Sequence, residues 1–157
     1  MDRGAPRCPP ADCADEVDLE LIEAWLQRAG FPPAARVDGD VLSVPLRGPH
    51  PTFRLHLQLF ADEKVLFLQV NDYLRVDEAE TTGALVMLLT QIATINYELL
   101  LGKLQLNPRT GEISLSAELQ LDDGLGFRTF AAVTDHLART AAARHPELLQ
   151  VARGGAF

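Results

Sequence analysis

Residues 53–70, FRLHLQLFADEKVLFLQV, show the clearest structural pattern in the chain. Apolar and polar residues alternate over 53–59, which predicts a β-strand with one face toward a core. A short turn at 61–63 follows, and residues 64–70 predict a second strand that is apolar on both faces. Strands joined by so short a turn pair in antiparallel fashion. We therefore expect an antiparallel sheet at the centre of the fold.

The segments before this strand pair predict a helix and a further strand. Residues 15–30 place apolar side chains at helical spacing, and Gly30 with the Pro32-Pro33 pair indicates where the helix ends. Residues 42–46 alternate and predict a strand, so the sheet is expected to begin as a three-stranded meander. Residues 1–14 are rich in proline and lack periodicity, which predicts a disordered leader.

The segment from Asp77 to Gly102 predicts a long helix that is apolar on two faces. Asp77 and Glu80 match a capping box, and Gly102 follows the expected helix end. At about 100° per residue, the apolar positions form two stripes roughly 120° apart. The first stripe contains Leu85, Leu88, Leu89, Ile92, Ile95 and Leu99, and the second contains Val86, Ala93, Tyr97 and Leu100. One small core readily covers a single stripe, so the second stripe predicts a dimer interface.

The remaining C-terminal sequence predicts a hairpin and a final helix. Residues 103–106 and 112–121 are joined by a turn that has Gly111 where φ is expected to be positive. A helix is expected from about residue 126, with Pro146 near its limit. The predicted fold is therefore α+β, in the order α-β-β-β-α-β-β-α, with helices packed on a twisted antiparallel sheet.

Composition and charge limit the classes of function. The chain has 157 residues, 47% apolar and 23% charged, which predicts a single domain over 15–148 followed by a tail at 149–157. A net charge of −8 removes the phosphate attraction on which direct nucleic-acid binding depends, and it favours a basic partner. Apolar runs are too short for a membrane span or a signal segment, so we expect a cytoplasmic protein with no membrane partner.

Residues that usually carry catalysis or bind metals lack the spacing that these functions need. Ser43, Ser114 and Ser116 lie in predicted strands without a nucleophile turn, and the histidines show no metal-binding spacing. Cys8 and Cys13 are too few for a zinc site, and both are expected to be free thiols in a reducing cytosol. We expect no cofactor, no metal and no enzymatic activity. An unrecognised enzyme remains the alternative, because carboxylates that are far apart in the sequence can lie together in the fold without leaving a spacing pattern.

Residues 85–145 carry a resemblance to known families. They contain Ile95-Asn96-Tyr97-Glu98-Leu99-Leu100, then Gly102, a turn that ends at Gly111, and a strand that closes at Leu119-Gln120-Leu121. This pattern resembles the YbjN-like family of sensory transduction regulators. The element order over about 15–148, with an asparagine near the end of the long helix and a glycine-punctuated hairpin, also resembles class I type III secretion chaperones.

The resemblance implies a homodimer with helices on one side of each twisted sheet. It also implies that a client protein binds along exposed apolar surface, without catalysis. Asn96, Gly102 and Gly111 are predicted to be structural, with the Asn96 amide tying the helix end to the loop that follows. A small-molecule-sensing regulator is the alternative function, and it requires a closed apolar pocket.

The client surface is predicted where apolar residues exceed what one helix–sheet interface can bury. This surface comprises the side of the first helix beside its core stripe and the less polar outer face of the first three strands. The predicted client-binding residues are Leu21, Trp25, Phe60, Val65 and Phe67. Acidic residues such as Glu20, Glu23 and Glu63 rim this surface and suit a client with apolar anchors and basic flanks. A dimer partner or the leader could instead cover it.

Overall fold

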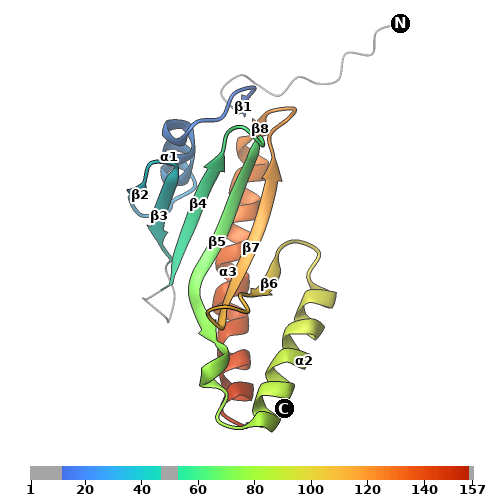
Figure 1. Ribbon diagram of the computed structural model, residues 1–157. Coiled ribbons are helices and arrows are strands. Elements are labelled where there is room, and N and C mark those ends of the chain that lie inside the picture. Colours follow the sequence, from blue (N-terminus) through green and yellow to red (C-terminus); the bar gives the residue numbers. More distant parts are fainter. Residues whose placement is uncertain (1–11, 47–52, 156–157) are drawn as a thin grey trace, which may run out of the picture.

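A computed structural model describes residues 12–46 and 53–155 of the chain (Figure 1). These residues form three α-helices, α1 (Leu19–Arg28), α2 (Thr82–Glu98) and α3 (Phe127–Ala152), and the short 3-10 helix η1 (Val76–Glu78). The strands before α2 are β1 (Cys13–Ala14), β2 (Ala35–Asp38), β3 (Val41–Pro45), β4 (Arg54–Phe60) and β5 (Val65–Arg75). The strands after α2 are β6 (Lys103–Leu106), β7 (Glu112–Gln120) and β8 (Leu125–Gly126).

An antiparallel sheet of six strands forms the centre of the molecule, in the order β2-β3-β4-β5-β7-β6. The sheet is clearly twisted along its longest strands (Figure 1). β4 and β5 pair from Arg54 opposite Asn71 to Phe60 opposite Val65, which places Leu57 opposite Leu68. The predicted α+β fold with an antiparallel sheet is confirmed.

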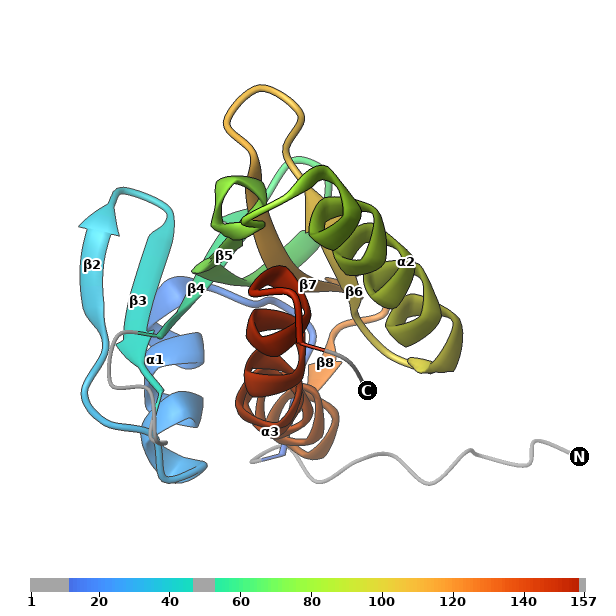
Figure 2. The same ribbon diagram turned by 90° about the horizontal axis from the view of Figure 1, so that it is seen from below.

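All three α-helices lie on one face of this sheet (Figure 2). α3 packs against β5 and β7, while α1 lies beside it next to β3 and α2 lies on its other side next to β6. The side chains between helices and sheet are apolar. Those without exposed surface include Leu42, Leu55, Leu57, Leu66, Leu68, Val70, Leu115 and Phe130. Within the described ranges no helix covers the opposite face, which we call the open face.

Helix α1 contributes Trp25 to the core. The helix begins after Asp18, whose Oδ1 accepts a hydrogen bond from the Leu21 N–H at 2.8 Å. The Trp25 side chain is 5% exposed, and its ring lies 5.7 Å from the Phe130 ring and 5.9 Å from the Phe127 ring. The prediction that Trp25 is part of an exposed client surface is therefore wrong. An amphipathic helix buries a stripe more than about 100° wide, and this stripe includes Trp25.

Two elements differ from the prediction because their signals are weak in the sequence. Strand β2 was not predicted, since all four of its residues are exposed and no apolar alternation marks it. Helix α2 begins after Thr81, whose Oγ1 accepts a hydrogen bond from the Ala84 N–H at 3.0 Å. Asp77, the predicted cap, lies in η1 and forms an ion pair with Arg75 instead.

Helix α3 extends past the limit predicted from Pro146 and continues to Ala152. Proline removes one backbone donor and crowds the preceding turn, which usually ends or kinks a helix. Here Leu148, Val151 and Ala152 are buried after the proline. Their burial offsets the cost of Pro146, so the first residues of the predicted tail belong to α3.

Ordered structure also begins earlier than predicted. Strand β1 pairs with β8, with Cys13 opposite Gly126, although both β1 residues were assigned to the leader. Cys13 is disulfide-bonded, so the prediction of a free thiol is wrong for this residue. Residues 1–11 of the predicted leader and 156–157 of the predicted tail lie outside the described residues.

We expect Trp25→Ala to lower the free energy of unfolding by about 3–5 kcal/mol, because it removes a buried aromatic side chain and leaves a cavity. Guanidinium denaturation followed by circular dichroism measures this loss. Val37→Ala is the control, since Val37 is 53% exposed. It should change the same quantity by less than about 0.5 kcal/mol. A similarly small loss for Trp25→Ala would contradict the placement of this side chain in the core.

Candidate functional site

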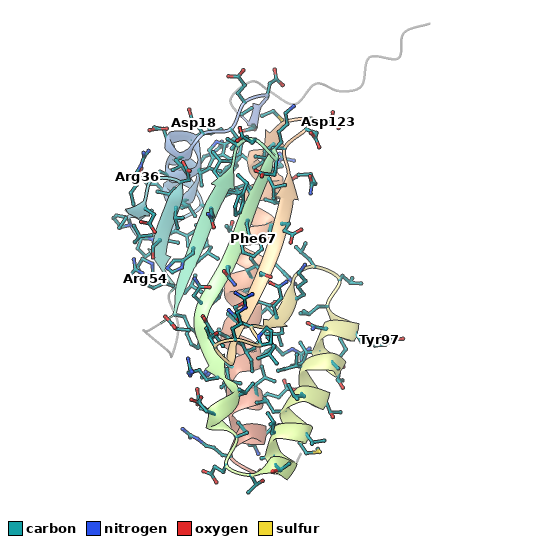
Figure 3. All side chains as sticks on the ribbon, in the orientation of Figure 1. Asp18, Arg36, Arg54, Phe67, Tyr97 and Asp123 are labelled. Carbon is teal, nitrogen blue, oxygen red and sulfur yellow. The ribbon has the colours of Figure 1, made fainter. Side chains whose placement is uncertain are left out.

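The outer side of α2 is the most apolar exposed surface of a described helix. Ala84, Leu88, Ile92 and Ile95 face the core, yet the opposite side of the helix is also apolar. We call the residues on that side the α2 outer face: Val86, Leu89, Ala93, Tyr97 and, just beyond the helix, Leu100. Tyr97 is 93% exposed and points away from the molecule (Figure 3). Three of the predicted dimer residues, Val86, Ala93 and Tyr97, thus share the exposed side of α2, and the fourth, Leu100, is exposed just beyond the end of the helix.

Two threonines beside this face do little to make it polar. Thr90 Oγ1 donates a hydrogen bond to the Val86 carbonyl at 2.8 Å, and Thr94 Oγ1 donates to the Thr90 carbonyl at 3.0 Å. The donor hydrogen of each hydroxyl is therefore bound to the helix backbone. Leu89, assigned to the core stripe from the sequence, is 39% exposed and adds to the apolar surface.

The amide of Asn96 anchors α2 to the edge of the sheet. Its Oδ1 accepts a hydrogen bond from the Leu104 N–H at 2.7 Å, and its Nδ2 donates to the Leu104 carbonyl at 3.0 Å. Leu104 lies in the edge strand β6, where backbone groups would otherwise lack partners. Asn96 therefore satisfies the strand edge and holds the C-terminal end of α2 against it.

Gly102 and Gly111 allow the turns on either side of β6. Both adopt positive φ, 83° and 73°, which favours glycine. A Cβ on Gly102 would lie 3.2 Å from the Ser116 carbonyl oxygen, and one on Gly111 would lie 2.7 Å from Val76 Cγ2. Space as well as backbone conformation therefore requires glycine at both positions.

Long polar side chains cover small hydroxyl residues on the open face. Arg54 Nε donates to Ser43 Oγ at 2.6 Å, and Gln69 Nε2 donates to Ser114 Oγ at 2.7 Å. Ser116 donates in turn to the Gln105 side chain at 2.8 Å. The three serines are therefore buried, although they lie on the side of the sheet away from the helices.

The structure separates the predicted client residues into two groups. Phe60 and Val65 are cross-strand neighbours on the open face, and Phe67 lies on the same face near the middle of the sheet (Figure 3). Phe60 is 38% exposed, while Val65 and Phe67 are half-buried. Leu21 packs against the core on the helical side, as does Trp25. The predicted single surface is therefore corrected to the three strand residues.

A hollow of about 240 Å³ adjoins Phe67 on the open face. Four adjacent strands, β2 to β5, supply the side chains around it. They are Val37, Asp38, Val41, His56, Gln58, Phe67, Gln69 and Asn71. This hollow was not predicted, because the alternation over residues 53–59 indicates only which side of the strand faces away from the core. The part of the sequence that could have indicated the hollow is the polar side of the alternation over residues 53–59, which supplies His56 and Gln58.

The imidazole of His56 forms part of the wall of this hollow. Its Nδ1 lies 2.5 Å from Asn71 Nδ2, at hydrogen-bonding distance. Burial lowers the pKa of His56 below 6.5, and the positive charge of Arg54 lowers it further. Asp72 and Glu112 act in the opposite direction, but burial is the largest effect. The ring is therefore neutral at neutral pH.

In residues 12–46 and 53–155, no group of three or more His, Cys, Asp or Glu side chains is placed to hold a metal ion. Over the same ranges, no helix has both the length and the apolar composition to span a bilayer. What these residues do present is an apolar helix face and a sheet face with a mixed polar hollow.

Known structures with the same architecture define the class of fold. A chain of the ExsC–ExsE complex matches with a TM-score of 0.59 and 20% identity, over 84% of this chain and 97% of that one. A chain of the HopA1–SchA chaperone–effector complex matches with a TM-score of 0.56 and 15% identity, over 83% and 99%. At these identities the likeness shows the fold. The chain has a secretion-chaperone-like α+β fold.

The sequence itself identifies the family. Residues 18–150 match the YbjN family model, described as "Putative bacterial sensory transduction regulator". YbjN from E. coli has a similar structure, with a TM-score of 0.61 and 13% identity over 86% of this chain and 96% of that one. No curated protein matches the sequence. The chain belongs to the YbjN family, which confirms the predicted resemblance.

We expect His56 to make the fold less stable in mild acid. Because its pKa is lower in the folded protein than the unperturbed value of 6.5, protons bind preferentially to the unfolded chain as the pH falls below that value. The free energy of unfolding therefore decreases as the pH falls from 6.5 toward the lower pKa that His56 has in the folded protein. His56→Gln should lose less stability than the wild type between about pH 7.5 and pH 5.5.

Urea denaturation at each pH measures this difference, because the comparison cancels titrating groups that both proteins share. The amide of the glutamine can still form a hydrogen bond with Asn71. Equal losses in both proteins would show that His56 does not contribute to the acid sensitivity.

Proposed function

We propose that this chain is a non-catalytic protein-binding module that works as a cytoplasmic homodimer and holds a client protein. The α2 outer face is the observation that carries the proposal. Val86 is 58% exposed, and Tyr97 and Leu100 are almost completely exposed. Soluble monomers rarely leave a continuous apolar surface of this kind in water. A protein partner is the simplest means of covering it.

A second copy of the chain is the partner that we assign to the α2 outer face. Two-fold symmetric dimers pair the same surface from both subunits, so a helix face that is apolar along its length is self-complementary. Ala93 lies near the middle of this face, where its small side chain lets two helices approach closely. Asn96 and the ion pair between Arg144 and Glu98, at 2.9 Å, hold α2 in position on each subunit.

The open face then remains available for the client. Phe60, Val65 and Phe67 provide apolar anchor points there. The complexes named ExsC–ExsE and HopA1–SchA, which share this fold, support binding to another protein chain. The net charge of −8 favours a client with basic segments.

A small-molecule-sensing regulator is the second candidate, and one cleft favours it. Ala29, Phe31 and Pro32 face Ala138 and Ala142 of α3 across a cleft of about 260 Å³. Small-molecule sites usually measure about 300–1,000 Å³ and enclose most of their ligand. This cleft is smaller and open to solvent, so the geometry favours the protein-binding module.

We expect the wild-type protein to have twice its chain mass of 17.2 kDa in solution. Tyr97→Glu should raise the dimer dissociation constant by at least about tenfold, because it places a charge in an apolar interface. Size exclusion with light scattering, run over a range of protein concentrations, measures the wild-type mass and the dissociation constant of the dimer. Met87→Glu is the control: Met87 is 53% exposed on the same helix but lies off the outer face, so the dimer should persist. A monomeric wild type at micromolar concentration would contradict the dimer.

We expect Phe67→Ser to reduce client retention while leaving the fold and the dimer intact. Phe67 points away from the core, so its loss removes an apolar anchor and leaves no cavity under the helices. The measurement is affinity capture from the native lysate with identification of retained proteins by mass spectrometry. Phe67→Leu is the control and should retain most of the client, since it keeps an apolar side chain. Full retention by Phe67→Ser would place the client site elsewhere.

A further inference from the structure

We infer that the hollow on the open face binds an arginine side chain of the client protein, with the methylene stem on Phe67 and Val41 and the guanidinium at Asp38. The inference rests on the proposed function, and it adds the chemistry of the residue that the client presents. It is argued from the strand register, from the lining groups of the hollow and from their charges.

The strand register places the key side chains in one row across the sheet. Asp38 lies opposite Val41, Val41 opposite Gln58, and Gln58 opposite Phe67. The row therefore runs from a carboxylate at β2 to an aromatic ring at β5. Strands lie about 4.8 Å apart, so the row is roughly 14 Å long. All four side chains of the row line the hollow, so an amphipathic side chain that enters it beside Val41 has the carboxylate on one side and the aromatic ring on the other.

The lining groups match the two parts of an arginine side chain. Phe67 and Val41 offer apolar contact for the methylene stem, which commonly packs on apolar surface while its charged head stays polar. Gln58 and Gln69 offer amide oxygens that accept hydrogen bonds, and the Asp38 carboxylate accepts two. A guanidinium carries five N–H donors and no acceptor, so it needs such an acceptor-rich site.

The charges around the hollow favour a cation. Of the eight described residues that line it, Asp38 alone is charged at neutral pH, because the lowered pKa of His56 leaves that ring neutral. Glu118, beside Phe67 on β7, is paired with Lys103 at 3.4 Å. The Arg54 guanidinium is held by Ser43, through its side chain at 2.6 Å and its carbonyl at 3.3 Å. An anion would find no free cation among the lining residues, and an apolar group would desolvate Asp38 without compensation.

Arginine fits this site better than lysine does. The planar guanidinium forms paired hydrogen bonds with a carboxylate, so its fork of donors matches the Asp38 side chain. An ammonium group is a strongly hydrated point charge, and it would lose more hydration in a hollow whose walls are mostly amides and apolar groups.

The test is a titration of the full chain with the peptide acetyl-Gly-Arg-Gly-amide, followed by the side-chain amide signals of Gln58, Gln69 and Asn71 in NMR spectra. We expect saturable shifts at these signals with a dissociation constant of about 1–10 mM, the range of a single side chain. The peptide with citrulline, which is neutral and has nearly the same shape, should produce no saturable shift. The lysine peptide should bind at least about fivefold more weakly.

Asp38→Asn should abolish saturation by the arginine peptide. Asp123→Asn is the matched control, because Asp123 is exposed in the turn between β7 and β8 (Figure 3) and does not line the hollow, so the same loss of charge should leave binding unchanged. Equal shifts with citrulline, or an unchanged titration for Asp38→Asn, would overturn the inference. Equal affinity for the lysine peptide would overturn the assignment to arginine.

The inference and the proposed function fail separately. A dimer that retains its client through Phe67 but shows no response to the arginine peptide overturns the arginine site alone. A monomer that retains no protein yet binds the arginine peptide through Asp38 supports the site and overturns the proposed function.

Discussion

The pairing of β4 with β5 is the contact on which the rest of the structure depends. Its register places Leu55, Leu57, Leu66 and Leu68 on one face, all without exposed surface. A shift by one residue would turn these leucines to the opposite face and bring His56 and Gln58 into the core. β3 and β7 join on either side and continue the same rows. The helices pack where this pairing creates an apolar surface.

Placing all helices on one face has consequences for function. The helices cover one face and enclose the core, so within the described residues the open face and the outer side of α2 have no element packed on them (Figure 2). These two surfaces differ in chemistry. The α2 outer face is almost entirely apolar, which suits a permanent contact between identical chains. The open face mixes apolar and hydrogen-bonding groups, which suits a partner that binds and leaves.

Polar side chains on the open face are organised rather than simply solvated. Arg54, Gln69 and Gln105 each form a hydrogen bond with a serine below, so they lie along the sheet instead of extending into water. This arrangement fixes the positions of donors and acceptors before any partner arrives. A site that is already ordered loses less entropy on binding. The hollow between Asp38 and Phe67 lies beside this network.

The sequence by itself determined those helices and strands whose pattern of apolar residues is complete within a short segment. Alternation over residues 53–59 identified β4, helical spacing identified α1, and the two apolar stripes of α2 were both visible. Asn96 was also recognised as a residue that ties the helix end, because a buried amide must find partners. By contrast, β2 has no apolar alternation, and its place at the sheet edge follows only from pairing with β3.

Only the tertiary structure decided which apolar residues are covered and by what. Trp25 is buried because Phe127 and Phe130, about 100 residues later in the chain, pack against it. Leu21 and Phe67 appeared to belong to one surface, yet the sheet lies between them. The hollow on the open face needs four strands in register before Asp38 and Phe67 share a row. Periodicity reports which side of an element a residue occupies, whereas contact between distant elements depends on the complete fold.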